Sequence, residues 1–130
     1  KALECRITHM ILRSFFGVDS NEEKISDRFD VDKAAEYINE KYSENISVRD
    51  IASVIALSPS HFSRIFKKET GLTPQEYLIR VRLDRAKSFL MRSRKSVTEI
   101  ALQCGFSSSA HFSSSFMKRF GKTPSEFKKY

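Results

Sequence analysis

The sequence predicts an all-α fold of about seven helices, arranged as two small, similar units joined by a long linking helix, with an extra helix at the N-terminus. Three observations support it: apolar residues recur with helical spacing, helix-start signals recur at matching places, and the chain contains an internal repeat. We expect an N-terminal helix and linker in residues 1–28, a first unit with the linking helix in residues 29–92, and a second unit in residues 93–130.

The internal repeat begins at Ser47 and again at Ser96. The first copy is SVRDIASVIALSPSHFSRIFKKETGLTPQEYL, and the second is SVTEIALQCGFSSSAHFSSSFMKRFGKTPSEF. The offset between them is 49 as far as Leu57 and 50 from Ser58 onward, so the second copy has one extra residue in its turn. Of the 31 paired positions, 14 are identical, which indicates two copies of one supersecondary unit.

Helix-start signals stand at the same places in both copies. Ser47 and Ser96 can each cap a helix, because an acidic residue follows three positions later and can pair with the cap's own amide. Thr73 and Thr123 mark a second pair of starts, each followed by proline at the first helical position. A glycine lies just before each threonine, where a chain leaving a helix often needs positive φ.

Between these starts the apolar spacing is helical, and Ser58 with Pro59 marks the start of a further helix in the first copy. Two short helices joined by a three- or four-residue turn form a helix-turn-helix unit, whose second helix DNA-binding proteins place in a major groove. The apolar positions are Val48, Ile51, Ala52, Ile55, Phe62, Ile65 and Phe66 in the first copy and Val97, Ile100, Ala101, Cys104, Phe112 and Phe116 in the second.

The remaining segments complete the two units. A linking helix is predicted from Pro74 to about Met91, roughly 27 Å long, and a short last helix from Pro124. Asp30 is expected to cap a helix from about Val31 to Tyr42. That helix should turn Ala35, Tyr37 and Ile38 inward, and the extra amphipathic helix upstream contains Leu3, Ile7, Met10, Ile11, Phe15 and Phe16, followed by a polar connection from Gly17 to Asp27.

The net charge of +7 is unevenly distributed. Residues 1–45 carry a net charge of −3, whereas residues 46–130 carry +10. A basic segment of this kind fits a polyanionic partner, although a solubilising surface would have the same composition. Cys5 and Cys104 provide neither a disulfide framework nor zinc-site spacing, and no apolar stretch is long enough to span a membrane. With no secretory signal after Lys1, we expect a fragment of a longer cytoplasmic protein.

The double pattern resembles the C-terminal DNA-binding domain of the AraC/XylS family of bacterial transcription regulators. The resemblance covers about Val31 to Lys128 and rests on HFSRIFKKETGLTPQEYL and CGFSSSAHFSSSFMKRFGKTPSEF, each with a T-P-x-E helix start. It implies seven helices and a sequence-specific domain that inserts two recognition helices into successive major grooves of double-stranded DNA. It also implies a separate upstream sensor or dimerisation domain, and RNA polymerase as a further partner.

The same resemblance implies that the base-facing residues lie early in each recognition helix. Arg64 is the strongest candidate, because its guanidinium can bind guanine O6 and N7 together. The second helix departs from the family pattern, since Ser114 stands where arginine is common, so we expect the first unit to read more sequence. The second unit either reads bases as well or mainly anchors the domain and reads the shape of the DNA. The base-contact candidates are Ser60, His61, Ser63 and Arg64 in the first unit and Ala110, His111, Ser113 and Ser114 in the second.

Further basic residues are candidates for contacts to phosphate, which would contribute affinity and salt dependence rather than sequence choice. The phosphate candidates are Arg49, Lys67, Lys68, Lys118 and Arg119. On the linking helix, Arg80, Arg82, Arg85 and Lys87 have two interpretations, and ion pairing with Asp84 or Glu76 is favoured over DNA contact.

Two rival functions remain to be weighed. An enzyme is disfavoured, because the sequence contains no Gly-rich phosphate loop, H-E-x-x-H or G-x-S-x-G motif, and no cofactor or metal is expected. His61 and His111 have no further metal ligand at helical spacing. A basic helical protein-interaction module is the alternative function, and a duplex-binding titration at several salt concentrations separates it from a DNA reader.

Overall fold

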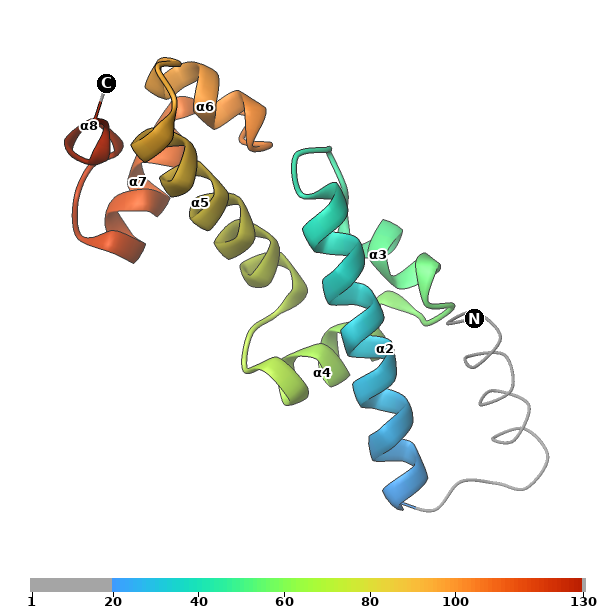
Figure 1. The fold of residues 1–130 in the computed structure, drawn as a ribbon. Coiled ribbons are helices and arrows are strands. Elements are labelled where there is room, and N and C mark those ends of the chain that lie inside the picture. The colour runs from blue at the N-terminus through green and yellow to red at the C-terminus, as the bar shows by residue number, and fades with distance from the viewer. Residues whose placement is uncertain (1–19, 130) are drawn as a thin grey trace.

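The computed structural model describes residues 20–129, and their side chains from residue 24 onward. Over that range the chain forms seven α-helices and no strand, as Figure 1 shows. The all-α prediction is confirmed, while the extra amphipathic helix expected upstream lies outside the described residues. The helices are α2 (Ser20–Lys41), α3 (Val48–Val54), α4 (Pro59–Thr70), α5 (Pro74–Arg92), α6 (Val97–Gln103), α7 (Ser109–Phe120) and α8 (Pro124–Phe127).

The start of α2 differs from the sequence prediction. The helix is continuous from Ser20, so Asp30 lies in its interior with 5% of its surface exposed and is not an N-cap. The polar connection expected to end at Asp27 is therefore helical from Ser20 onward. Residues 20–30 contain no glycine or proline to stop a helix, and this part of α2 is also bound to α4 through an ion pair between Arg28 and Glu69 at 3.8 Å.

The inward face of α2 matches the prediction at Ile38 and in part at Tyr37, which packs against the core, but Ala34 takes the place expected for Ala35. Ala34 and Ile38 are fully buried, whereas Ala35 and Tyr37 are only half-buried. The buried residues Val31, Ala34 and Ile38 follow one another at spacings of three and four, which is the stripe that a helix presents to a core.

The helix starts predicted within the internal repeat are confirmed in both copies. Ser47 Oγ accepts a hydrogen bond from the amide of Asp50 at 3.1 Å, and the Asp50 carboxylate accepts one from the amide of Ser47 at 2.9 Å. The same reciprocal pair begins α5, α6 and α8. Each pair satisfies two amides that the first helical turn leaves without partners, so the chain's local sequence determines where these helices begin.

The buried side chains form two apolar clusters that meet on α5. Leu78 and Val81 belong to the first cluster, which they share with α2, α3 and α4, whereas Leu83 and Leu90 belong to the second, shared with α6 and α7. The linking helix thus closes the first unit with its N-terminal half and begins the second unit with its C-terminal half.

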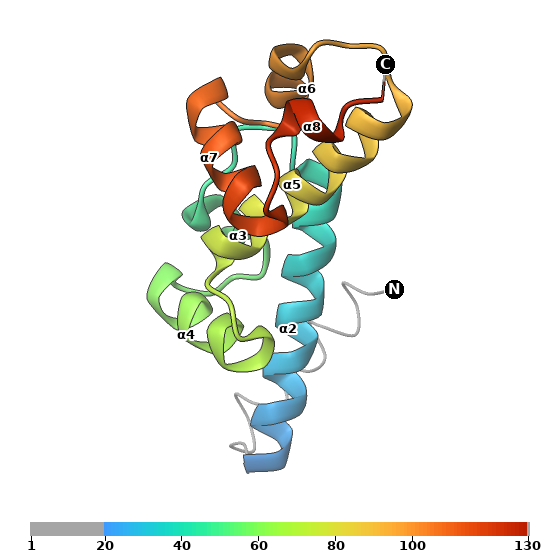
Figure 2. The same cartoon turned by 90° about the vertical axis from the view of Figure 1, so that its left-hand side faces the viewer.

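The two second helices of the helix-turn-helix units, α4 and α7, lie on the same side of the molecule. Figure 2 shows one above the other and running in a similar direction, with α2 on the opposite side and α5 between the units. The sequence prediction requires that both helices can contact the same ligand, and this arrangement allows it.

Candidate nucleic-acid interface

The first recognition helix, α4, is set by its cap and by an aromatic underside. Ser58 Oγ accepts a hydrogen bond from the amide of His61 at 3.2 Å, and Pro59 occupies the first turn, where it needs no amide partner. Phe62 and Phe66 are fully buried and meet edge to face with ring centroids 5.4 Å apart. Burial of this face directs the opposite face outward.

That outward face of α4 carries the predicted contact residues. Ser60, Arg64 and Lys67 are exposed and recur at helical spacing, so they form one polar stripe. His61 and Ser63 flank the stripe and are half-buried. The stripe combines a hydroxyl, a guanidinium and an ammonium, which is a donor set suited to base edges and phosphate.

The second recognition helix, α7, has the same frame and a different surface. Ser108 Oγ accepts from the amide of His111 at 3.1 Å, while Phe112 and Phe116 are fully buried. Ala110 and Ser114 are exposed, but the Ser114 hydroxyl donates to the backbone carbonyl of His111 in its own helix at 3.3 Å. Apart from His111, the first two turns of α7 expose small side chains and no lysine or arginine.

The histidines at equivalent positions are not equally placed. His61 is half-buried, whereas His111 is exposed and its ring lies edge to face with Phe106 at 5.6 Å between centroids. Within residues 24–129, no group of three or more His, Cys, Asp or Glu side chains is arranged to hold a metal ion. The contact with Phe106 accounts for the position of the His111 ring.

All five predicted phosphate residues are exposed, namely Arg49, Lys67, Lys68, Lys118 and Arg119. Arg119 also has an internal partner, because its guanidinium donates to Asp84 Oδ1 from Nε at 3.1 Å and from Nη2 at 2.9 Å. This ion pair fastens the end of α7 to α5. Sequence spacing did not indicate it, since the two residues are far apart in the chain.

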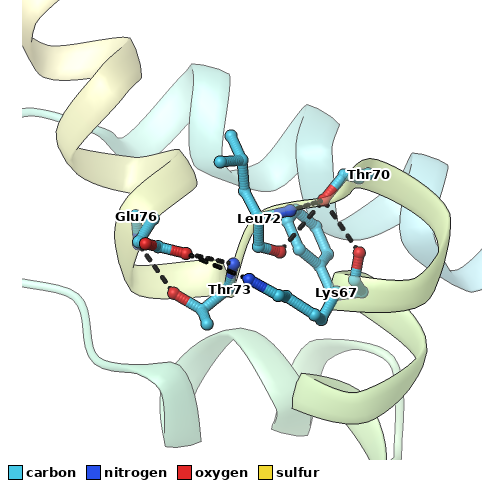
Figure 3. Close-up of polar contacts among 6 residues, drawn as sticks. Lys67, Thr70, Leu72, Thr73 and Glu76 are labelled. Atoms are coloured by element: carbon cyan, nitrogen blue, oxygen red, sulfur yellow. Dashed lines mark hydrogen bonds and ion pairs between the residues drawn. The ribbon is translucent and has the colours of Figure 1, made fainter. Parts of the chain in front are cut away.

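Lys67 is close to the corner between α4 and α5, which Figure 3 shows in detail. Its ammonium lies 3.9 Å from Glu76 Oε1, and the same carboxylate oxygen accepts from the amide of Thr73 at 2.8 Å. The hydroxyl of Thr70 donates to the carbonyl of Phe66 at 2.8 Å and accepts from the amide of Leu72 at 3.1 Å. These bonds stabilise the corner and limit how α4 can tilt relative to α5.

Arg82, Arg85 and Lys87 on the linking helix have structural partners other than those expected, whereas the charge of Arg80 helps to lower the pKa of Glu76, one of the two expected partners. Asp84 pairs with Arg119 and Glu76 with Lys67. Arg82 is buried and donates to two backbone carbonyls, and Lys87 lies over the rings of Phe120 and Phe127 at 4.9 and 5.4 Å. Arg80 is exposed, and Arg85 lies over the ring of Tyr42 at 5.3 Å.

The ionisable groups whose pKa values are shifted have structural roles. The pKa values of Glu76, Glu99 and Glu126 are lowered because each carboxylate accepts a hydrogen bond from the backbone amide of its capping residue, which favours the charged form. Burial raises the pKa of the Cys104 thiol to about 11. A thiol of this kind stays protonated and is a poor nucleophile.

No helix within the described range is both long and apolar enough to cross a lipid bilayer.

Two capped recognition helices on one side of an all-α molecule, with a basic stripe on the first, define a double helix-turn-helix DNA-binding domain. A family model described as a helix-turn-helix domain matches residues 51–130. The probable transcriptional regulator LumQ of Photobacterium leiognathi is 35% identical over 106 residues, which is 82% of this chain and 43% of LumQ. The chain thus spans less than half the length of that relative.

Solved structures agree with the sequence relatives. An AraC-type transcriptional regulator from Chromobacterium violaceum superposes with a TM-score of 0.74 at 35% identity, covering 78% of this chain and 90% of that one. The DNA-binding domain of AdpA, a global transcriptional factor solved in complex with a target DNA, has a TM-score of 0.72 at 29% identity, covering 75% and 87% of the two chains. The chain belongs to the AraC/XylS family and is a DNA-binding domain of a transcription regulator of that family.

Proposed function

We propose that α4 and α7 enter successive major-groove segments on one face of a duplex, and that α4 supplies most of the sequence discrimination. The observations that carry this proposal are the exposed stripe of Ser60, Arg64 and Lys67 on α4 and the position of α4 and α7 on the same side of the molecule (Figure 2). The linking helix has 19 residues and is therefore about 28 Å long, similar to the roughly 34 Å between successive groove segments.

In this proposal α7 acts mainly as an anchor. Ala110 and Ser114 can contact a thymine methyl group or a phosphate, but they discriminate weakly between base pairs, and the hydroxyl of Ser114 is already bonded within the helix. Lys118 on the last turn of α7 and Lys68 on the last turn of α4 supply phosphate contacts. Arg119 contributes less to DNA, because Asp84 holds its guanidinium.

The experiment that tests this function is selection of duplexes from a random pool by the chain, followed by titration of the selected duplex at several salt concentrations. We expect one enriched sequence with two recognisable halves and an affinity that falls steeply with salt, since each neutralised phosphate releases counterions. A basic protein-interaction module would enrich no sequence. Enrichment of one half alone would restrict base reading to a single unit.

The whole protein's activity is a wider proposal. Because the chain spans 43% of LumQ, we propose that this domain works with a separate sensing or dimerising domain and contacts RNA polymerase at promoters in the bacterial cytoplasm. We also propose that the domain acts by binding and not by catalysis, and burial makes the Cys104 thiol a poor nucleophile by raising its pKa to about 11. Transcription from a promoter carrying the selected duplex, measured with and without the chain and purified polymerase, tests the polymerase contact.

A further inference from the structure

Arg82 lies between the two apolar clusters, on the part of α5 where one unit ends and the other begins. Only 9% of its surface is exposed. Its Nε donates to the carbonyl of Tyr42 at 2.7 Å, and its Nη2 donates to the carbonyl of Glu44 at 2.9 Å. Both carbonyls belong to the loop that follows α2, so Arg82 binds a first-unit loop to the linking helix.

The second unit touches the same guanidinium. Gly105, in the turn between α6 and α7, has a φ of +97°, and a Cβ on it would lie 2.7 Å from Arg82 Nε and 2.7 Å from the carbonyl oxygen of Tyr42. The turn that leads into the second recognition helix is therefore pressed against the pair that Arg82 and Tyr42 form. Tyr42 also packs against both apolar clusters, and Arg85 lies over its ring.

Arginine is the residue that this junction requires. Burial lowers the pKa of Arg82, since desolvation disfavours its charge, so the side chain is retained against an energetic penalty. Its planar fork reaches two carbonyls at once, whereas a lysine ammonium on a flexible stem holds two fixed acceptors less rigidly. Removing the fork takes a charged donor from the Tyr42 carbonyl and another from the Glu44 carbonyl, which also accepts from the amide of Ile46 at 2.9 Å. These properties suit a rigid connection between two bodies.

We propose that Arg82 is a positioning residue for DNA recognition: it fixes α7 relative to α4, and thereby sets the spacing between half-sites that the domain accepts. The proposal rests on the proposed function, in which both helices read one duplex. Once the first helix is bound, a fixed second helix meets its half-site at a high effective concentration, but only if the spacing matches. If the junction is loosened, the effective concentration falls at the correct spacing. Incorrect spacing between the half-sites then costs less binding affinity.

The main experiment compares Arg82→Lys with the unaltered chain on three duplexes: the selected whole site, that site with one base pair inserted between its halves, and the first half alone. We expect Arg82→Lys to bind the whole site about tenfold more weakly, to bind the first half equally well, and to lose less affinity on insertion. Arg92→Lys is the matched control, because Arg92 is an exposed arginine on the same helix whose Nε donates only to Ser88 in that helix, at 3.4 Å.

Two results on these duplexes overturn the proposal. One is an unchanged affinity for the whole site together with an unchanged insertion penalty in Arg82→Lys. The other is an equal loss on the half-site and the whole site, which would show that Arg82 supports the folding of a unit rather than the setting between units. Failure to select any duplex would refute the proposed function instead, and a DNA-free measurement then decides on Arg82.

That measurement is the distance between nitroxide labels on α4 and α7, recorded by pulsed electron paramagnetic resonance. Labels on Ser60→Cys and Ala110→Cys report it in a chain with Cys5→Ser, because Cys104 is buried. We expect one narrow distance distribution in the labelled chain and a broad one after Arg82→Lys. A broad distribution with Arg82 present, or an equally narrow one in the variant, contradicts the proposal, and the first of these results does not depend on whether the variant folds.

Discussion

The first and second units share caps and buried positions, and they differ in what their recognition helices expose. Arg64 and Lys67 on α4 occupy the positions that Ser114 and Met117 occupy on α7. The aromatic residues beneath them are the same in kind and are fully buried in both units. The two units therefore show that burial and capping specify the helix-turn-helix frame, while the exposed positions are free to differ.

The ends of the two recognition helices also differ. In the first unit, Thr70 bonds the corner that leads into the 19-residue α5, whereas in the second unit Phe120 stands at the matching position and packs against Phe116 and Phe127 before the short α8. The first corner must orient a long helix, so directional hydrogen bonds stabilise it. The second corner leads into the short α8, and there aromatic packing accompanies the hydrogen bonds between Thr123 and Glu126.

The turns before the recognition helices are a third difference. Ala56 adopts a positive φ of 57° and Gly105 one of 97° at matching positions, and the same two backbone bonds close both turns. Alanine is tolerated in the first turn at a strain of about 1 kcal/mol. The second turn is pressed against Arg82 and Tyr42, and only glycine fits it.

The largest expected effect is at these turns. Gly105→Ala should lower the free energy of unfolding by about 3 kcal/mol, because it combines backbone strain with a Cβ 2.7 Å from a backbone oxygen. Ala56→Gly, the reverse change at the matching position, should alter it by less than about 1 kcal/mol, since relief of strain is offset by chain entropy. Urea denaturation measures both. Equal effects would mean that the two turns are equally confined.

The next largest effects are expected from substitutions in the recognition helices. Arg64→Ala should weaken binding to the selected duplex by about 1 to 3 kcal/mol and relax discrimination at one base pair. Ser114→Ala should weaken it by less than about 0.5 kcal/mol, because its hydroxyl is bonded within α7. Fluorescence anisotropy with the selected duplex and its single-base variants measures both. The opposite ranking would transfer the main sequence-reading role to the second unit.

A smaller effect is expected at the first corner. Thr70→Val should destabilise the chain by about 1 kcal/mol, because the Leu72 amide loses the acceptor that the half-buried hydroxyl provides. Ser53→Ala is the matched control, since the exposed Ser53 hydroxyl donates only to the Asp50 carbonyl in its own helix. Thermal melts compare the two. A Thr70→Val variant as stable as Ser53→Ala would show that the Thr70 hydroxyl does not stabilise this corner.

The smallest effect is the pH dependence of the caps. The pKa of Glu99 is lowered from 4.5 in the folded chain, so its carboxylate contributes stability above that value and the contribution is lost as the pH falls through the lower, folded pKa. Glu99→Gln should therefore lose less stability than the unaltered chain between neutral pH and acid. Melting temperatures along a pH series measure this. Parallel curves for the two chains would contradict a role for the charged form.

Much of the fold was predictable because its signals are local. Four capping pairs, two glycine caps and the apolar stripes lie within one or two helical turns of the structure they specify. The start of α2 was predicted wrongly because that prediction, too, relied on local signals alone. Asp30 has the local chemistry of an N-cap, but this segment continues as helix and the side chain is buried in the folded chain.

The candidate site also has one part that the sequence predicted and one part that depends on the tertiary structure. The sequence by itself determined that two capped helix-turn-helix units exist and which residues of α4 and α7 face outward, because helical period and burial of Phe62, Phe66, Phe112 and Phe116 leave one orientation. Only the tertiary structure decided the partners of Arg82 and Arg119. These residues bond to groups 35 to 40 positions away, and such contacts exist only after two separately formed units have packed against one linking helix.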